Sequence, residues 1–165
     1  MFSPRQTWSL LADADANAVE LNRDQKAMGS VLKLFAAETK GYSGVLFSNG
    51  RGGAVCPVDG IQLENTGSAA LALAKHLDGD KRATEADEKE LREKLDAMKE
   101  SLKRLVNETD GAVPAGIQKT GSGYTWFYFN VAHIASAAWA GFFLGATREG
   151  GYDVNFNPYR CDLIC

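Results

Sequence analysis

An internal repeat divides the chain into two similar units. Residues 31–41 (VLKLFAAETKG) match residues 101–111 (SLKRLVNETDG) at an offset of 101 − 31 = 70. Further along, residues 67–72 (GSAALA) match residues 135–140 (ASAAWA) at an offset of 135 − 67 = 68. Repetition at a nearly constant offset indicates a duplicated supersecondary unit. Each unit is predicted to be a helix, a long glycine-rich loop and a helix of small residues.

Apolar residues recur at helical spacing in four segments, whereas strand signals are scarce. The third segment carries charges of alternating sign on its other faces, which is typical of a solvated helix held by i,i+4 pairs. We therefore expect one all-α domain over residues 1–165, with two helical hairpins at about residues 22–78 and 84–147. The four stripes are Ala27, Met28, Val31, Leu32 and Phe35, in a helix expected to end at Gly41; Leu63, Gly67, Ala70, Leu71, Ala74 and Leu77; Leu91, Leu95, Met98, Leu102 and Leu105; and Val131, Ala135, Ala138, Trp139 and Phe142.

The two loops are long and rich in glycine and aromatic residues, and both lie at the same end of their predicted hairpins. They cover residues 41–62 and 111–130. Loops of this length in a compact domain are usually functional or disordered, and their aromatic content argues against disorder. We expect the working surface of the protein on the face that carries both loops.

Composition excludes several classes of function. A net charge of −3 with a pI near 5.4 gives no general attraction to nucleic acid or to anionic membranes. The most apolar run, residues 131–144, is shorter than a bilayer span, and no signal peptide is visible, so the default expectation is a cytoplasmic protein. Three cysteines and two histidines offer poor metal-ligand spacing, so we expect no metal and no cofactor.

Two motifs resemble those of a known family. Residues 58–73 (VDGIQLENTGSAALAL) resemble the form DGIWxEGTAxMALA, and residues 126–159 resemble the form WYYYNxxHxxATAWxxxAxxGxNPF. Both forms occur, in this order, near the C-terminus of bacterial α/α-toroid proteins that are similar to six-hairpin glycosidases. The resemblance implies a toroid built from antiparallel helical hairpins. Because a full toroid needs about six hairpins, the chain is similar to its last third.

The resemblance implies carbohydrate processing or carbohydrate binding. Asp59 and Glu64 match the first motif, so either is a candidate general acid of a glycosidase-like site. The alternative is structural: Asp59 caps a helix, and Glu64 interacts with the positive start of the same helix. Gln62 stands where the family usually has an aromatic residue, which removes a stacking surface for a sugar.

The second loop supplies the candidate sugar platform. Tyr124, Trp126 and Tyr128 alternate along the chain, which places three rings on one side. Asn130 and His133 follow and match the second motif, although a lone histidine before a packed helix is also common as a structural residue. The predicted saccharide contacts in the first loop are Arg51 and Phe47.

Two functions remain open from the sequence. The first is a glycosidase-like or saccharide-binding toroid fragment. The alternative is a non-catalytic module that binds a protein through an exposed hairpin flank. In either case we expect a homo-oligomer or a partner chain that completes the array, because the terminal hairpins lack neighbours. The expected contact is the fourth helix, with its apolar residues Ile134, Trp139, Phe142 and Phe143, partly covered by the C-terminal tail.

Overall fold

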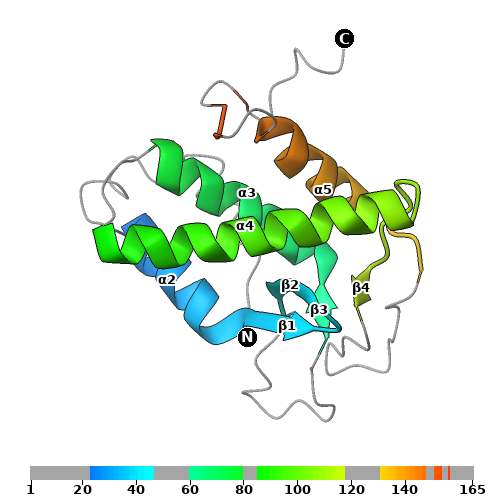
Figure 1. Cartoon of the computed structure of the whole chain (residues 1–165), viewed down its shortest axis with the longest axis horizontal. Coiled ribbons are helices and arrows are strands. Elements are labelled where there is room, and N and C mark those ends of the chain that lie inside the picture. The colour runs from blue at the N-terminus through cyan, green and yellow to red at the C-terminus, as the bar shows by residue number, and fades with distance from the viewer. Residues whose placement is uncertain are drawn as a thin grey trace.

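Four helices and four short strands make up the described part of the chain (Figure 1). The computed structural model describes residues 23–46, 60–79, 85–117, 131–147, 151–153 and 156. The elements in chain order are α2 (Arg23–Phe35), β1 (Ala36–Thr39), β2 (Tyr42–Val45), β3 (Ile61–Gln62), α3 (Leu63–Gly79), α4 (Glu85–Glu108), β4 (Gly116–Ile117) and α5 (Ile134–Ala146).

The predicted all-α fold, a partial toroid of helical hairpins, is wrong, because the described residues form two small antiparallel sheets besides the helices. The first sheet lies where the end of a helix was expected. The chain turns at Lys40 (φ 53°) and Gly41 (φ 73°), so that Ala36 pairs with Val45 and Thr39 with Tyr42. A two-residue turn with both φ angles positive matches the twist of a hairpin, and the second position favours glycine. The helix therefore ends at Phe35, and residues 36–39, which were expected to continue it, form the first strand of the hairpin.

The two halves of the repeat share this local conformation in different surroundings. Asp110 (φ 51°) and Gly111 (φ 80°) repeat the positive φ angles of the hairpin turn. In the second unit, however, α4 continues to Glu108 before the chain turns, and no hairpin follows among the described residues. The matching sequences therefore specify the same turn and different flanking elements.

A ribbon of extended segments joins the two units. In the second sheet, Ile61 pairs with Ile117 and Gln62 with Gly116. On one edge of this second sheet, an isolated bridge links Ile61 to Leu46, the residue that follows the first sheet. On the other side, residues 113–115 run beside residues 131–133, because the Ala115 N–H donates to the Val131 carbonyl at 3.0 Å and the His133 N–H donates to the Val113 carbonyl at 2.9 Å. The helices α3 and α5 both begin at this ribbon.

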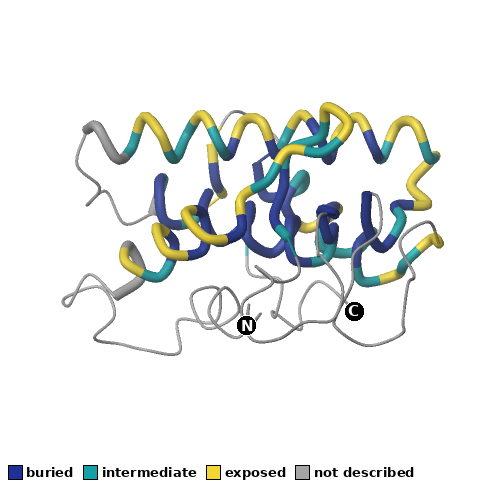
Figure 2. The backbone as a smooth tube through the Cα atoms, turned by 90° about the horizontal axis from the view of Figure 1, so that it is seen from below, coloured by how far each residue is buried: buried dark blue, intermediate teal, exposed yellow. Residues whose placement is uncertain are grey.

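Helix α3 is the centre of the core. Its residues 69–74 are all buried, at 2% exposure or less. From α4, Leu95, Met98, Leu102 and Leu105 of the predicted stripe are buried and Leu91 is half-buried, while the outer face of the helix is solvated (Figure 2). From α5, Ala140, Phe143 and Ala146 are buried. The predicted i,i+4 pairs on α4 are confirmed by ion pairs such as Lys94–Glu90 at 2.7 Å.

Candidate functional site

The starts of α3 and α5 are capped in the same way by unusual residues. Gln62 precedes α3, and its side-chain oxygen accepts the Asn65 N–H at 2.6 Å. His133 precedes α5, and its Nδ1 accepts the Ser136 N–H at 3.4 Å, with the Ser136 hydroxyl 3.1 Å from the same nitrogen. In both helices the side chain before the first turn satisfies the N–H three residues later, which is the role of an N-cap.

A buried polar layer lies under the first turn of α3. The Thr66 hydroxyl donates to the Gln62 carbonyl at 2.8 Å and accepts the Val45 N–H at 3.1 Å. Ser68 donates to the Asn65 carbonyl at 3.2 Å. Asn65 is 3% exposed, and its Nδ2 has no hydrogen-bond partner among the described residues. The hydrogen bond from Val45 to Thr66 ties the first sheet to α3.

The close approach of β2 to α3 requires glycine at one position. A Cβ added at Gly44 would lie 2.5 Å from Ile61 Cγ2 and 2.6 Å from Thr66 Oγ1. These separations are far shorter than van der Waals contact. Gly44 therefore lets the hairpin backbone reach the buried hydroxyl of Thr66.

Of the predicted site residues, Glu64 and His133 lie in the described part of the chain. Glu64 is half-buried in the first turn of α3, and no hydrogen bond or ion pair links its side chain to another described residue. The position fits the expected interaction with the positive helix start. His133 caps α5, which agrees with the structural alternative for this residue.

The other predicted contacts lie outside the described residues. They are Asp59, Tyr124, Trp126, Tyr128, Asn130, Arg51 and Phe47. Residues 47–59 leave and rejoin the described chain at Leu46 and Gly60, and residues 118–130 do so at Ile117 and Val131. All four points lie on or next to the extended ribbon, because Leu46 and Ile117 both pair with Ile61 and Val131 accepts from Ala115.

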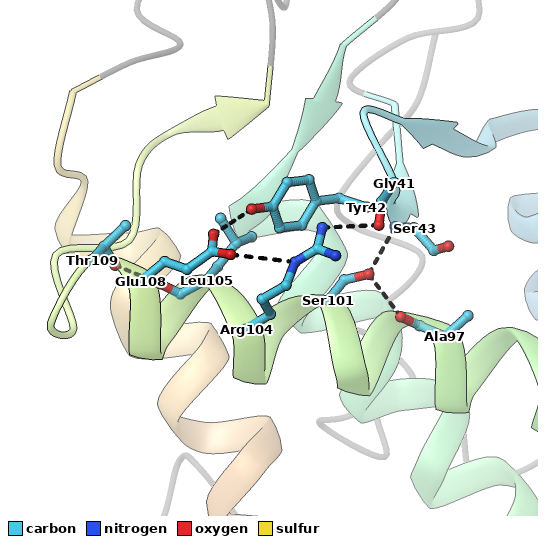
Figure 3. A network of polar contacts seen from close by, with 9 residues as sticks. All are labelled: Gly41, Tyr42, Ser43, Ala97, Ser101, Arg104, Leu105, Glu108 and Thr109. Atoms are coloured by element: carbon cyan, nitrogen blue, oxygen red, sulfur yellow. Dashed lines mark hydrogen bonds and ion pairs between the residues drawn. The ribbon is translucent and has the colours of Figure 1, made fainter.

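Sequence reasoning missed a polar network that fixes the first hairpin to α4 (Figure 3). The Arg104 guanidinium lies over the Tyr42 ring, 3.6 Å from its centroid, and donates to the Gly41 carbonyl at 2.9 Å. The Tyr42 hydroxyl donates to Glu108, which also pairs with Arg104 at 3.6 Å. The Arg104–Glu108 spacing was visible in the sequence, but nothing there linked it to Tyr42, some sixty residues earlier (104 − 42 = 62).

The same network changes the pKa of the Tyr42 hydroxyl. The hydrogen bond from Tyr42 to Glu108 raises the pKa of the Tyr42 hydroxyl above its ordinary value, with desolvation adding to the shift. The nearby Arg104 opposes both effects by favouring the tyrosinate. The hydroxyl therefore stays protonated at neutral pH and acts as a donor that holds the hairpin.

A second hydrogen bond joins the hairpin to α4. The Ser43 N–H donates to the Ser101 hydroxyl at 2.8 Å, and that hydroxyl donates to the Ala97 carbonyl at 2.8 Å (Figure 3). Between these contacts and α2, the surface is hollowed along one flank of α4. One hollow there has a volume of about 360 Å³ and reaches two deeply buried side chains, Leu32 and Met98.

One side of α5 leaves large apolar groups in solvent. Ile134 is 89% exposed, Val131 61% and Phe142 38%. Phe143, which was predicted to share this patch, is fully buried and belongs to the core. Phe156 of the C-terminal segment contacts Phe142, with ring centroids 6.3 Å apart, so part of this segment lies against the patch.

The described residues contain no group of three or more His, Cys, Asp or Glu residues placed to hold a metal ion. None of the helices described here is both long and apolar enough to cross a bilayer.

Comparison of the chain with protein-family models, with curated proteins and with solved structures gives no match. The family resemblance therefore stays a prediction based on two motifs. The toroid that it implied is contradicted by the two sheets, and the described residues give no support to a glycosidase or to carbohydrate binding.

Proposed function

We propose that the protein is a non-catalytic interaction module that binds a second copy of itself through one side of α5. The observation that carries this proposal is the exposure of Ile134, at 89%, beside Val131, at 61%. We call this surface the α5 flank, and its residues are Val131, Ile134, Ala138, Gly141, Phe142 and Gly145. Those within the helix recur at spacings of three and four, so they share one side of it.

The chemistry of the flank suits contact with an identical surface. Residues 134–146 contain no charged side chain, so two copies can meet there without like-charge repulsion. A Cβ added at Gly141 or Gly145 would meet nothing within 4 Å, so no residue in the described part of the chain packs against these positions. Small residues between apolar ones allow two helices to approach closely. A two-fold contact brings the same residues of both copies together.

The test is the mass of the protein in solution. Light scattering on the purified protein at tens of micromolar should give about twice the chain mass of 17.8 kDa. Ile134→Lys should shift the population to monomer, because it places a charge in the contact. Leu34→Lys is the matched control, since Leu34 is 41% exposed on α2 and lies off the flank.

Two results would reject the proposal. One is a monomeric wild-type protein across the concentration range. The other is an oligomer that Ile134→Lys leaves intact while its thermal unfolding remains normal. A monomer whose flank nevertheless binds an apolar dye would point to a different partner chain in place of a second copy.

A further inference from the structure

Among the described segments, residues 131–133 form an outer edge of the ribbon that joins the two repeat units. The Val131 carbonyl accepts the Ala115 N–H at 3.0 Å. The His133 N–H donates to the Val113 carbonyl at 2.9 Å. Both of these backbone groups therefore point inward, toward the neighbouring segment of the ribbon. No described residue forms a hydrogen bond with the outer side of this edge.

Ala132 presents its backbone groups on that outer side. Successive residues of an antiparallel strand direct their N–H and C=O groups to alternate sides, so Ala132 points away from the segment that Val131 and His133 contact. The residue opposite Ala132 in the ribbon is Pro114, which has no N–H to donate. Ala132 is exposed, and neither of its backbone groups forms a hydrogen bond within the described part of the chain. The edge therefore offers one donor and one acceptor to solvent.

The length and chemistry of this edge favour a second copy of the chain over a foreign peptide. A peptide that adds to a sheet edge draws its affinity from a row of main-chain hydrogen bonds, but α5 begins at Ile134 and ends the edge one residue after His133. A two-fold rotation brings the donor and the acceptor of Ala132 onto their counterparts, so this one residue supplies two bonds. Residues 131–146 contain no Asp, Glu, Lys or Arg, so like charges do not oppose the contact.

We propose that two copies of the protein pair through Ala132 as adjacent antiparallel strands, so that the ribbon continues from one copy into the other. The Ala132 N–H of each copy donates to the Ala132 carbonyl of the other, and the two-fold axis passes between the two residues. Such pairing rests on the proposed function, self-association at the α5 flank, and adds the backbone atoms that meet. The exposed side chains of Val131 and Ile134 flank the paired strands.

Hydrogen exchange at the Ala132 amide is the direct test. At a concentration where light scattering gives a dimer, this amide should exchange at least tenfold more slowly in the wild type than in Ile134→Lys, the expected monomer. The Ala115 amide bonds within one copy and should exchange at similar rates in both proteins. A dimer whose Ala132 amide exchanges at the monomer rate would overturn the pairing and leave the proposed function standing. A monomeric wild-type protein would overturn both.

Two substitutions at Ala132 give an independent readout. Ala132→Pro removes the N–H that the other copy needs, so the dissociation constant of the dimer should rise at least tenfold. Ala132→Ser keeps the N–H and is the matched control, with a dissociation constant within about twofold of the wild type. Thermal unfolding of the dilute proteins checks that both variants fold. Equal dissociation constants for a folded Ala132→Pro and the wild type would overturn the pairing.

Cross-linking measures the distance between the two copies and does not depend on the proline variant. The Cα atoms of a hydrogen-bonded antiparallel pair lie about 5.5 Å apart, within the range that a disulfide spans. With Cys56, Cys161 and Cys165 changed to serine, Ala132→Cys should form a disulfide-linked dimer under mild oxidation. Leu34→Cys, at an exposed position on α2, is the matched control and should stay unlinked. No cross-link at residue 132, or equal cross-linking in the control, would overturn the pairing.

Discussion

Gly67 of α3 lies against Trp139 of α5, so closely that a methyl group at Gly67 would be 2.8 Å from the Trp139 Cβ and 2.9 Å from its carbonyl carbon. Optimal carbon–carbon contact is about 3.5–4.0 Å. Gly67→Ala should therefore force the two helices apart and lower the free energy of unfolding by about 1–3 kcal/mol, the usual cost of overpacking a core. Urea unfolding followed by circular dichroism measures the loss.

The matched control is Gly29→Ala on α2. An added Cβ at Gly29 meets nothing within 4 Å. Alanine is the better helix former by about 1 kcal/mol, so this variant should be as stable as the wild type or more stable. Equal destabilisation of both variants would show that the α3–α5 contact does not depend on the absence of a side chain at Gly67.

Thr66 joins the first sheet to α3 through one hydroxyl. Thr66→Val keeps the shape of the side chain but leaves the buried Val45 N–H without its acceptor, so we expect a loss of about 1–3 kcal/mol of stability. Thr66→Ser restores the hydroxyl and should recover most of the loss, apart from the missing methyl group. Amide exchange at Val45 should accelerate in the valine variant alone. Protection of that amide in both variants would contradict the assigned hydrogen bond.

His133 caps α5, so the effect of replacing it can be predicted. Serine and asparagine are preferred N-caps, so His133→Ser should preserve the stability of the protein. His133→Ala removes the acceptor for the Ser136 N–H and should cost about 1 kcal/mol. A large loss in the serine variant, measured by thermal unfolding, would show that the imidazole does more than cap α5.

The helical part of this fold could be predicted because its signal is local. The stripe of α4 and the small-residue pattern of α3 follow from spacing alone, and their buried residues agree with it. The strands could not be predicted in the same way. β3 and β4 are two residues each, and Ile61 meets Ile117 only because the fold brings distant segments together.

In the candidate site, too, only the features with a local sequence signal could be predicted. The position of Glu64 in a first helical turn was predicted from its neighbours in the sequence. A cap was the structural alternative for Asp59, which lies outside the described residues. The role of Gln62, whose side-chain oxygen accepts the Asn65 N–H, was not predicted, because glutamine is not among the residues that usually cap a helix. The hollow beside α4 is lined by residues of α2, the first hairpin and α4, and no periodicity along one segment indicates such a surface.

The pairing of Tyr42 with Glu108 predicts a response to alkaline pH. The folded protein raises the pKa of Tyr42 above the ordinary 10.0, so it holds this proton more tightly than the unfolded chain does. The stabilisation is therefore fully present below about pH 10 and is lost as the pH rises through the folded pKa. Tyr42→Phe should remove this component of the alkaline loss of stability. In ultraviolet titration, Glu108→Gln should lower the pKa of Tyr42 toward 10, and an unchanged titration would contradict the pairing.

Asp78 connects three parts of the chain, and its two oxygens can be tested separately. Oδ1 accepts from Arg92 of α4 at 3.1 Å, and Oδ2 accepts the Tyr152 N–H at 2.7 Å. Asp78→Ala should cost about 1–3 kcal/mol and expose the Tyr152 amide to rapid hydrogen exchange. Arg92→Ala removes the first contact alone, so the Tyr152 amide should stay protected. Asp96→Ala, on the exposed face of α4, is the control for losing a carboxylate. If the Tyr152 amide exchanges at the wild-type rate in Asp78→Ala, the C-terminal segment is held by other contacts.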